Sequence, residues 1–253
     1  MIVDRIPDGA LVFDCRHKTH QPGAGYRAFE AGHLPGAQHL NLDTQLSAPV
    51  RPDGIGGRHP LPEPAVFGAL MRRCGLSAGR LVVGYDDIGG AYAARLWWLL
   101  RWLGHDNVAV LSGGLSAVEV PLESGPAAPT VAGSWLPRVC SERVATRSEA
   151  ARVGLLVDAR APGRFRGEHE ILDPIAGHIP GAINRPWTDS LVGGRLTTTP
   201  DIPRGPGVVY CGSGVTACVT LLLLDAAGRD DLRLYPGSWS DWLAGGGPVA
   251  TGP

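Results

Sequence analysis

The chain lacks an excess of charge of either sign and lacks any long apolar run. Its formal net charge is −1 over 253 residues, and without a basic face we expect no nucleic acid and no anionic membrane as a partner. The apolar stretches are interrupted, as LWWLLRWLG is by Arg101, or are shorter than the ~18 residues of a membrane span. These absences argue against a nucleic-acid-binding or membrane-spanning protein.

The chain also lacks the cysteine patterns of disulfide-rich and metal-binding proteins. Its five cysteines include no CxxC pair, and the stretch MIVDRIPDGALVFDC has acids and a proline where a secretory signal has its apolar core. An odd count of cysteines outside a secretory context argues against a disulfide framework. No His, Cys or Asp cluster has metal-ligand spacing. We therefore expect a soluble, cytoplasmic protein with no metal and no other cofactor.

The sequence does contain an internal repeat. Four motifs recur in the same order: LVFDCR (11–16) and LLVDAR (155–160), GHLPGA (32–37) and GHIPGA (177–182), LVVGYDDIGGA (81–91) and GVVYCGSGVTA (207–217), VLSGGLSAV (110–118) and LYPGSWSDW (234–242). Residues 124–139 between the copies are rich in Pro, Gly, Ala and Ser without periodicity, which is typical of a linker. We expect one domain over 1–123, a linker over 124–139 and a second domain over 140–253.

Each copy alternates short β-branched runs with helical patterns. LVVGY and GVVYC are typical of strands, whereas PAVFGALMRRCG and AARLWWLLRWLG have helical spacing and end in glycine. Such alternation predicts an α/β fold of two tandem domains, each a small parallel sheet flanked by helices. The second copy is shorter ahead of its glycine loop, so we expect one of its flanking helices to be reduced to a loop.

The most informative segment joins the strand that ends at Cys211 to an apolar helix through a glycine-containing turn. Glycines let successive N–H groups point inward, and the first turn of the helix adds unpaired N–H donors. A cysteine in this position should have a lowered pKa and react as a thiolate. The loop that would surround its sulfur consists of Gly212, Ser213, Gly214, Val215 and Thr216. In the first copy Asp86 stands where Cys211 stands, and we expect its carboxylate to bind the N–H groups of its own loop.

The ordered motifs DAR, GHIPGA, CGSGVTAC and YPGSWSDW resemble those of the tandem-domain rhodanese sulfurtransferases, over nearly the whole chain. The resemblance implies that Cys211 accepts a sulfane sulfur, holds it as a persulfide and passes it to a nucleophile. It also implies that the first domain, with Asp86 at the cysteine position, is catalytically inactive. The CGSGVT loop resembles the branch that uses 3-mercaptopyruvate, whereas thiosulfate-using relatives carry basic residues at the positions of Gly212 and Ser213.

The same resemblance implies which arginines bind the donor. Arg164, in GRFRG, matches the substrate-facing arginine of the family, and Arg58, in GGRHPLP, matches an arginine that reaches toward the active cleft. The mercaptopyruvate branch has a second arginine nine residues after the first, where this chain has Asp173. This departure leaves the donor open, since a lone arginine binds a keto acid less tightly. Three other arginines could substitute: Arg166, Arg185 and Arg195.

The histidines of the GH(L/I)PGA motif have two interpretations. A histidine at a turn before proline usually braces the backbone, and we expect this of His178. In some relatives a first-domain histidine of this motif is proposed to relay protons, which leaves a relay role open for His33. The DxR pairs Asp14–Arg16 and Asp158–Arg160 flank strand ends and should brace the loops there.

We therefore expect a sulfurtransferase that moves sulfur from 3-mercaptopyruvate, in preference to thiosulfate, through Cys211 to a thiol or cyanide. A protein thiol such as thioredoxin is a possible acceptor. The alternative is a persulfide relay or regulatory module that acts with a protein partner. A cysteine phosphatase is disfavoured because its phosphate-binding arginine, six residues after the cysteine, is replaced by Ala217.

Overall fold

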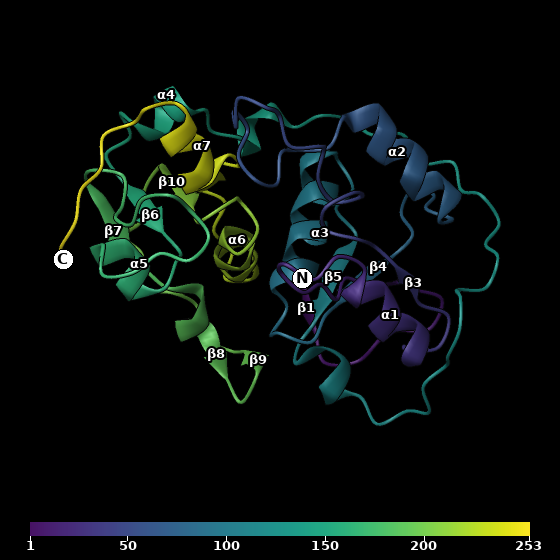
Figure 1. Cartoon of the computed structure of the whole chain (residues 1–253). Helices are drawn as coiled ribbons and strands as arrows, with labels where there is room; N and C mark the ends of the chain where they lie inside the picture. Colours follow the sequence, from purple (N-terminus) through teal and green to yellow (C-terminus); the bar gives the residue numbers. More distant parts are fainter. The chain divides into compact units, whose positions relative to one another are not determined.

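Two parallel sheets, one in each half of the sequence, organise the chain (Figure 1). The computed structural model describes all residues from 1 to 253, and its contacts divide them into two units. Unit 1 comprises 1–48, 62–140 and 193–196, and unit 2 comprises 49–61, 141–192 and 197–253. Residues 49–61 thus belong to unit 2 although they lie in the first half of the sequence.

Unit 1 has a five-stranded parallel sheet. Its strand order is β1 (Ile2–Val3), β5 (Val108–Leu111), β4 (Val82–Tyr85), β2 (Leu11–Asp14) and β3 (Gln38–His39). The helices are α1 (Ala24–Ala31), α2 (Pro64–Arg73) and α3 (Ala91–Trp102), with a 3-10 turn, η1 (Gly114–Ala117). The helical spacing of 64–75 and 93–104 predicted α2 and α3 correctly.

Unit 2 has a four-stranded parallel sheet in the order β11 (Leu232–Leu234), β10 (Gly207–Tyr210), β6 (Leu156–Asp158) and β7 (Ala182–Asn184). Its helices are α4 (Arg147–Ala150), α5 (Pro162–Arg166), α6 (Ala217–Ala226) and α7 (Ser238–Ala244), with 3-10 turns η2 (Ser141–Arg143) and η3 (Trp187–Ser190). Between β7 and β10 the chain forms only η3, β8 (Leu191–Val192) and β9 (Arg195–Leu196). The expected loss of a flanking helix is therefore confirmed.

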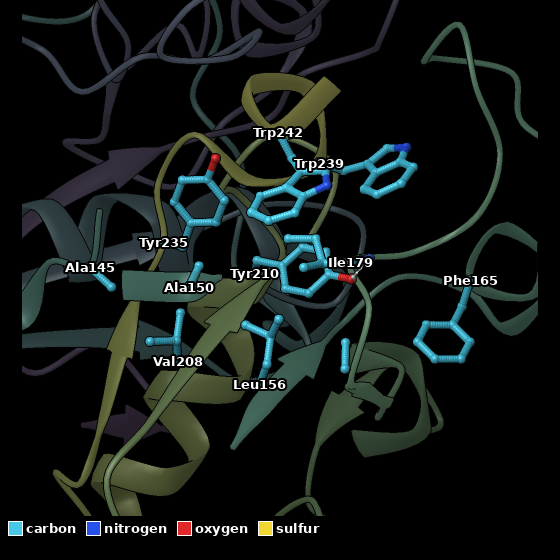
Figure 2. Close-up of a cluster of buried hydrophobic side chains, with 11 residues drawn as sticks. Ala145, Ala150, Leu156, Phe165, Ile179, Val208, Tyr210, Tyr235, Trp239 and Trp242 are labelled. Atoms are coloured by element: carbon cyan, nitrogen blue, oxygen red, sulfur yellow. Dashed lines mark hydrogen bonds between the residues drawn. The ribbon is translucent and has the colours of Figure 1, made fainter. Parts of the chain in front are cut away.

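The sheet of unit 2 is covered on both faces, as the fold-class prediction requires. Alternate strand residues point to opposite faces, and Leu156, Val208 and Tyr210 pack with the aromatic residues Trp239 and Trp242 of α7 (Figure 2). Helix α6 contacts β10 and β11 and is buried from Ala217 through Leu224. No helix of the chain combines the length and the apolar character needed to cross a membrane.

The repeated motifs form the same contacts in both units. Arg16 Nη2 lies 2.6 Å from Asp14 and 2.6 Å from the carbonyl of Gly32, while Arg160 Nη2 lies 2.6 Å from Asp158 and 2.6 Å from the carbonyl of Gly177. Each arginine thus ties the end of a central strand to the GH(L/I)PGA turn. The predicted bracing role of the DxR pairs is confirmed.

The 49–61 segment is fixed to α7 by hydrogen bonds from its backbone. The N–H of Gly56 donates to Asp241 Oδ1 at 2.7 Å, and the N–H of Arg58 donates to Ser240 Oγ at 3.1 Å. Gly57 has a φ of +78°, and a Cβ there would lie 2.4 Å from the carbonyl oxygen of Gly237. Because neither the φ nor the distance suits another residue, Gly57 sets how closely this segment approaches α7.

Replacing Gly57 with alanine should therefore loosen the 49–61 segment. The added methyl group must displace backbone, which costs about 1–3 kcal/mol beyond the conformational strain. We expect the amides of Gly56 and Arg58 to exchange with solvent deuterium roughly tenfold or more faster. Gly181→Ala is the matched control, because Gly181 has a φ of +82° but open space around the missing Cβ. Equal exchange in the two variants would contradict this account of Gly57.

Candidate active site

The backbone around Cys211 is held by the start of α7. The N–H groups of Trp239 and Ser240 donate to the carbonyls of Cys211 and Gly212, each at 3.0 Å. In return, the N–H of Cys211 donates to Ser238 Oγ at 3.1 Å. Ser238 is fully buried and has a φ of 55°, in the left-handed region that favours glycine. No local sequence pattern indicates the role of Ser238, which depends on the packing of α7 against the loop.

The Cys211 sulfur is surrounded by hydrogen-bond donors. Burial alone would raise the pKa of the thiol, but the Thr216 hydroxyl and the backbone N–H groups of Ala217, Ser213 and Gly214 lower it below its ordinary value. Cys211 is only 2% exposed, so few waters compete for these donors. The expected lowering of the pKa is confirmed, and the site favours a thiolate.

Gly214 allows the loop to curl so tightly. Its φ is +74°, and a Cβ there would lie 2.2 Å from the carbonyl oxygen of Pro236. Any side chain at this position would push the loop away from the segment that precedes α7. The N–H of Gly214 would then no longer be directed at the sulfur.

The corresponding loop of unit 1 is occupied by its own carboxylate. Asp86 is fully buried and accepts hydrogen bonds from the N–H groups of Ile88, Gly90, Tyr92 and Ala93 at 2.8–3.1 Å. The expectation that Asp86 binds its own loop is confirmed. A carboxylate cannot carry sulfane sulfur, so this loop has the shape of the Cys211 loop without its nucleophile.

Two arginines lie directly beside the Cys211 loop. A Cβ on Gly212 would be 2.9 Å from Arg58 Nη2 and 3.3 Å from Arg164 Nη2. The structure thus brings together the two arginines predicted from different parts of the sequence. A side chain at Gly212 would have to displace these guanidinium groups, which occupy the adjacent space.

Asp173 connects these two arginines. Arg164 Nη2 donates to Asp173 Oδ2 at 3.0 Å, and Arg58 Nη1 donates to Asp173 Oδ1. The Asp173 side chain is 2% exposed. Burial, reinforced by the neighbouring Glu170 carboxylate, raises the pKa of Asp173, although Arg58 and Arg164 act to lower it. The residue that stands in place of a second arginine therefore holds an arginine supplied by the 49–61 segment.

The ion pairs continue from this cluster into the core. Glu170 Oε2 lies 2.7 Å from Arg164 Nε and 3.6 Å from Arg160 Nη1. Arg160 in turn pairs with Asp158 at the end of β6 and lies over the ring of Trp239. The charges alternate along this chain, so that Arg164 is anchored to the sheet.

His59 was not identified from the sequence. Its Nδ1 lies 2.7 Å from Ser213 Oγ, within hydrogen-bonding distance. The histidine adjoins Arg58 in GGRHPLP, but the two partners are 154 residues apart in the sequence. Only the docking of the 49–61 segment brings an imidazole to the Cys211 loop.

Arg58 and Asp173 also line a mostly apolar cavity of about 300 Å³. The remaining lining residues are Val50, Gly54, Gly57, Leu172, Pro174, Ser240, Leu243 and Ala244. This cavity gives Arg58 and Asp173 an open neighbouring space.

The other candidate residues have structural contacts. His33 stacks on Phe29 at 3.8 Å between ring centroids and places Nδ1 2.8 Å from the Phe29 carbonyl. His178 has the same two contacts with Phe165, at 3.7 and 2.8 Å. This equivalence favours a bracing role for both histidines. The alternative arginines are engaged elsewhere: Arg166 with Glu168, Arg185 with the Asp201 carbonyl and Arg195 with Asp4.

Comparisons with known proteins agree with this geometry. Residues 2–120 and 141–245 each match the rhodanese-like domain. The chain is 42% identical, over 96% of its length and 92% of the relative's, to a probable 3-mercaptopyruvate sulfurtransferase of Pseudomonas aeruginosa. It is 38% identical, over 93% of its length and 88% of the relative's, to SseB, a putative thiosulfate sulfurtransferase of Mycobacterium tuberculosis.

Among solved structures, SseA from Escherichia coli, a 3-mercaptopyruvate sulfotransferase, superposes with a TM-score of 0.77 at 30% identity. The match covers 90% of this chain and 92% of SseA. Both domain matches and the full-length relatives lead to the same assignment: the chain belongs to the rhodanese family and is a sulfurtransferase.

Proposed function

We propose that the protein transfers a sulfane sulfur from 3-mercaptopyruvate through a persulfide on Cys211 to a thiol or cyanide. The proposal rests on the surroundings of the Cys211 sulfur, which is almost completely buried. One hydroxyl and three backbone N–H donors nevertheless lower the pKa of this thiol. Such donors stabilise an anion without bringing a side-chain charge into the loop. They suit the thiolate and equally the persulfide anion that replaces it.

In the first step the Cys211 thiolate attacks the sulfur of the donor thiol. The carbon–sulfur bond of the donor breaks, and its electron pair leaves on carbon as the enolate of pyruvate. The enolate takes up one proton to give pyruvate. The outer sulfur gives up the proton of the donor thiol in exchange, so that Cys211 is left with a persulfide anion. In the second step a thiolate or cyanide attacks the outer sulfur, the sulfur–sulfur bond breaks and its electron pair returns to Cys211.

The proton for the enolate is supplied by the Ser213–His59 pair in this proposal. Ser213 belongs to the loop around the sulfur, and its hydroxyl lies 2.7 Å from the imidazole of His59. A hydroxyl that is hydrogen-bonded to an imidazole can donate a proton and recover it from the ring. This step does not use His33, whose Nε2 lies 3.8 Å from Glu123 Oε2 in unit 1.

The donor carboxylate is bound by Arg58 and Arg164. Both guanidinium groups lie beside Gly212, next to the nucleophile, and guanidinium groups bind carboxylates with paired N–H donors. The names of the relatives from P. aeruginosa and E. coli support mercaptopyruvate, while the M. tuberculosis relative is named for thiosulfate. A small-donor site of this kind favours turnover with a free substrate over a relay that depends on a protein partner.

Persulfide formation is tested by intact-mass spectrometry after incubation with each donor. The wild-type protein should gain one sulfur from mercaptopyruvate, and Cys211→Ser should gain none and lose all thiocyanate formation with cyanide. Cys74→Ser is the control, because Cys74 is a partly exposed cysteine of unit 1 and should leave loading intact. Activity in Cys211→Ser would refute the mechanism. A higher kcat/KM for thiosulfate than for mercaptopyruvate would refute the donor assignment.

Thr216→Val tests how the thiolate is stabilised. The substitution removes one hydroxyl donor to a charged sulfur, so the pKa of Cys211 should rise. A raised pKa means less thiolate at neutral pH, and the pH profile of alkylation by iodoacetamide should shift to higher pH. Thr220→Val, in the helix that follows Thr216, is the matched control, since the buried Thr220 hydroxyl has no hydrogen-bond partner. An unshifted profile for Thr216→Val would contradict the role of this hydroxyl.

A further inference from the structure

The two arginines beside the Cys211 loop, Arg58 and Arg164, both form ion pairs with the buried carboxylate of Asp173. Both oxygens of Asp173 are engaged, Oδ1 by Arg58 and Oδ2 by Arg164. Arg164 is also paired with Glu170, whose side chain is 3% exposed. The two positive charges at the loop are therefore balanced by two buried negative charges before any donor binds.

We propose that Asp173 is a specificity-determining residue, which selects donors with one negative charge over donors with two. The inference rests on the proposed function, in which Cys211 takes sulfur from a small anionic donor. Mercaptopyruvate carries one charge, on its carboxylate, whereas thiosulfate is a dianion. Asp173 thus favours the binding of mercaptopyruvate over that of thiosulfate.

Geometry gives Asp173 its first effect, which is to orient the guanidinium groups. Arg58 donates from Nη1 to Asp173. Its other terminal nitrogen, Nη2, is the atom nearest the position that a Cβ on Gly212 would take. Arg164 likewise keeps both Nη atoms within reach of this space, at 3.3 and 3.5 Å from the position of a Gly212 Cβ. The N–H groups left over face the loop and can bind one carboxylate.

Charge gives Asp173 its second effect, which depends on the donor. The repulsion between a bound anion and the Asp173 carboxylate is proportional to the charge of the anion. Because the Asp173 side chain is 2% exposed, this repulsion is weakly screened by water and salt. It weakens the binding of a dianion about twice as much, in free energy, as that of a monoanion.

The test is Asp173→Asn, which removes the charge and keeps the size of the side chain. We measure kcat/KM for thiosulfate and for mercaptopyruvate with cyanide as the acceptor. The ratio of the two, thiosulfate over mercaptopyruvate, should rise about tenfold, as expected for one unit charge several ångströms away in partly solvated surroundings. A ratio that is unchanged or lower would overturn the proposal.

Glu168→Gln is the matched control. It removes a carboxylate from the same stretch of chain, but Glu168 is exposed and pairs only with the exposed Arg166. Its donor ratio should equal that of the wild type. A tenfold rise in this control would show that overall charge sets the ratio and would overturn the assignment to Asp173.

A second measurement uses the wild-type enzyme and tests the selection of monoanions over dianions if Asp173→Asn fails to fold. In the wild-type enzyme, pyruvate should inhibit the use of mercaptopyruvate at a lower concentration than sulfate does. Sulfate inhibition at an equal or lower concentration would overturn the proposal. The proposed function fails separately, if wild-type Cys211 gains no sulfur from mercaptopyruvate in the mass measurement.

Discussion

A negative charge on a sulfur that is almost fully buried must be matched by donors held in place, and this constraint shapes the loop that follows β10. The chain meets it with backbone N–H groups and one hydroxyl, which requires that the loop curl around Cys211. Curling in turn requires Gly214 against Pro236 and the buried Ser238 at the start of α7. The loop of unit 1 meets the same requirement for the Asp86 carboxylate, so the ring of donors belongs to the fold, and the two units differ in the residue at its centre.

Features encoded within short stretches of sequence were predictable. The repeated motifs, the strand–turn–helix around Cys211 and the helical spacing of α2 and α3 depend on neighbouring residues, and each was identified from the residues themselves. The binding of Asp86 to its own loop was predictable too, because aligning the two copies places a carboxylate where the other copy has a thiol. The bracing of Asp158 by Arg160 follows equally from a two-residue spacing.

Features that depend on distant residues were not predictable from residue patterns. His59 and Ser213, 154 residues apart, are joined only when the 49–61 segment docks on α7. Arg58 was identified by resemblance alone, and nothing in the sequence linked it to Asp173, 115 residues away. From the sequence, Asp173 is therefore recognisable only as a residue that stands where the mercaptopyruvate branch has a second arginine. The structure shows it as the acceptor that holds two arginines, an effect that no local pattern encodes.

In the proposed mechanism, the composition of unit 2 also explains how a loop with no basic side chain can serve an anionic donor. Gly212 and Ser213 contribute no charge, and the space beside Gly212 is filled instead by guanidinium groups from α5 and from the 49–61 segment. One of the two arginines and the imidazole next to it are thus encoded in the first copy, although the nucleophile is encoded in the second. The first copy contributes charge and a hydrogen-bonding partner to a site whose sulfur it does not carry. Although Asp86 stands at the cysteine position of the first copy, residues 49–61 of that copy are part of the unit that contains Cys211.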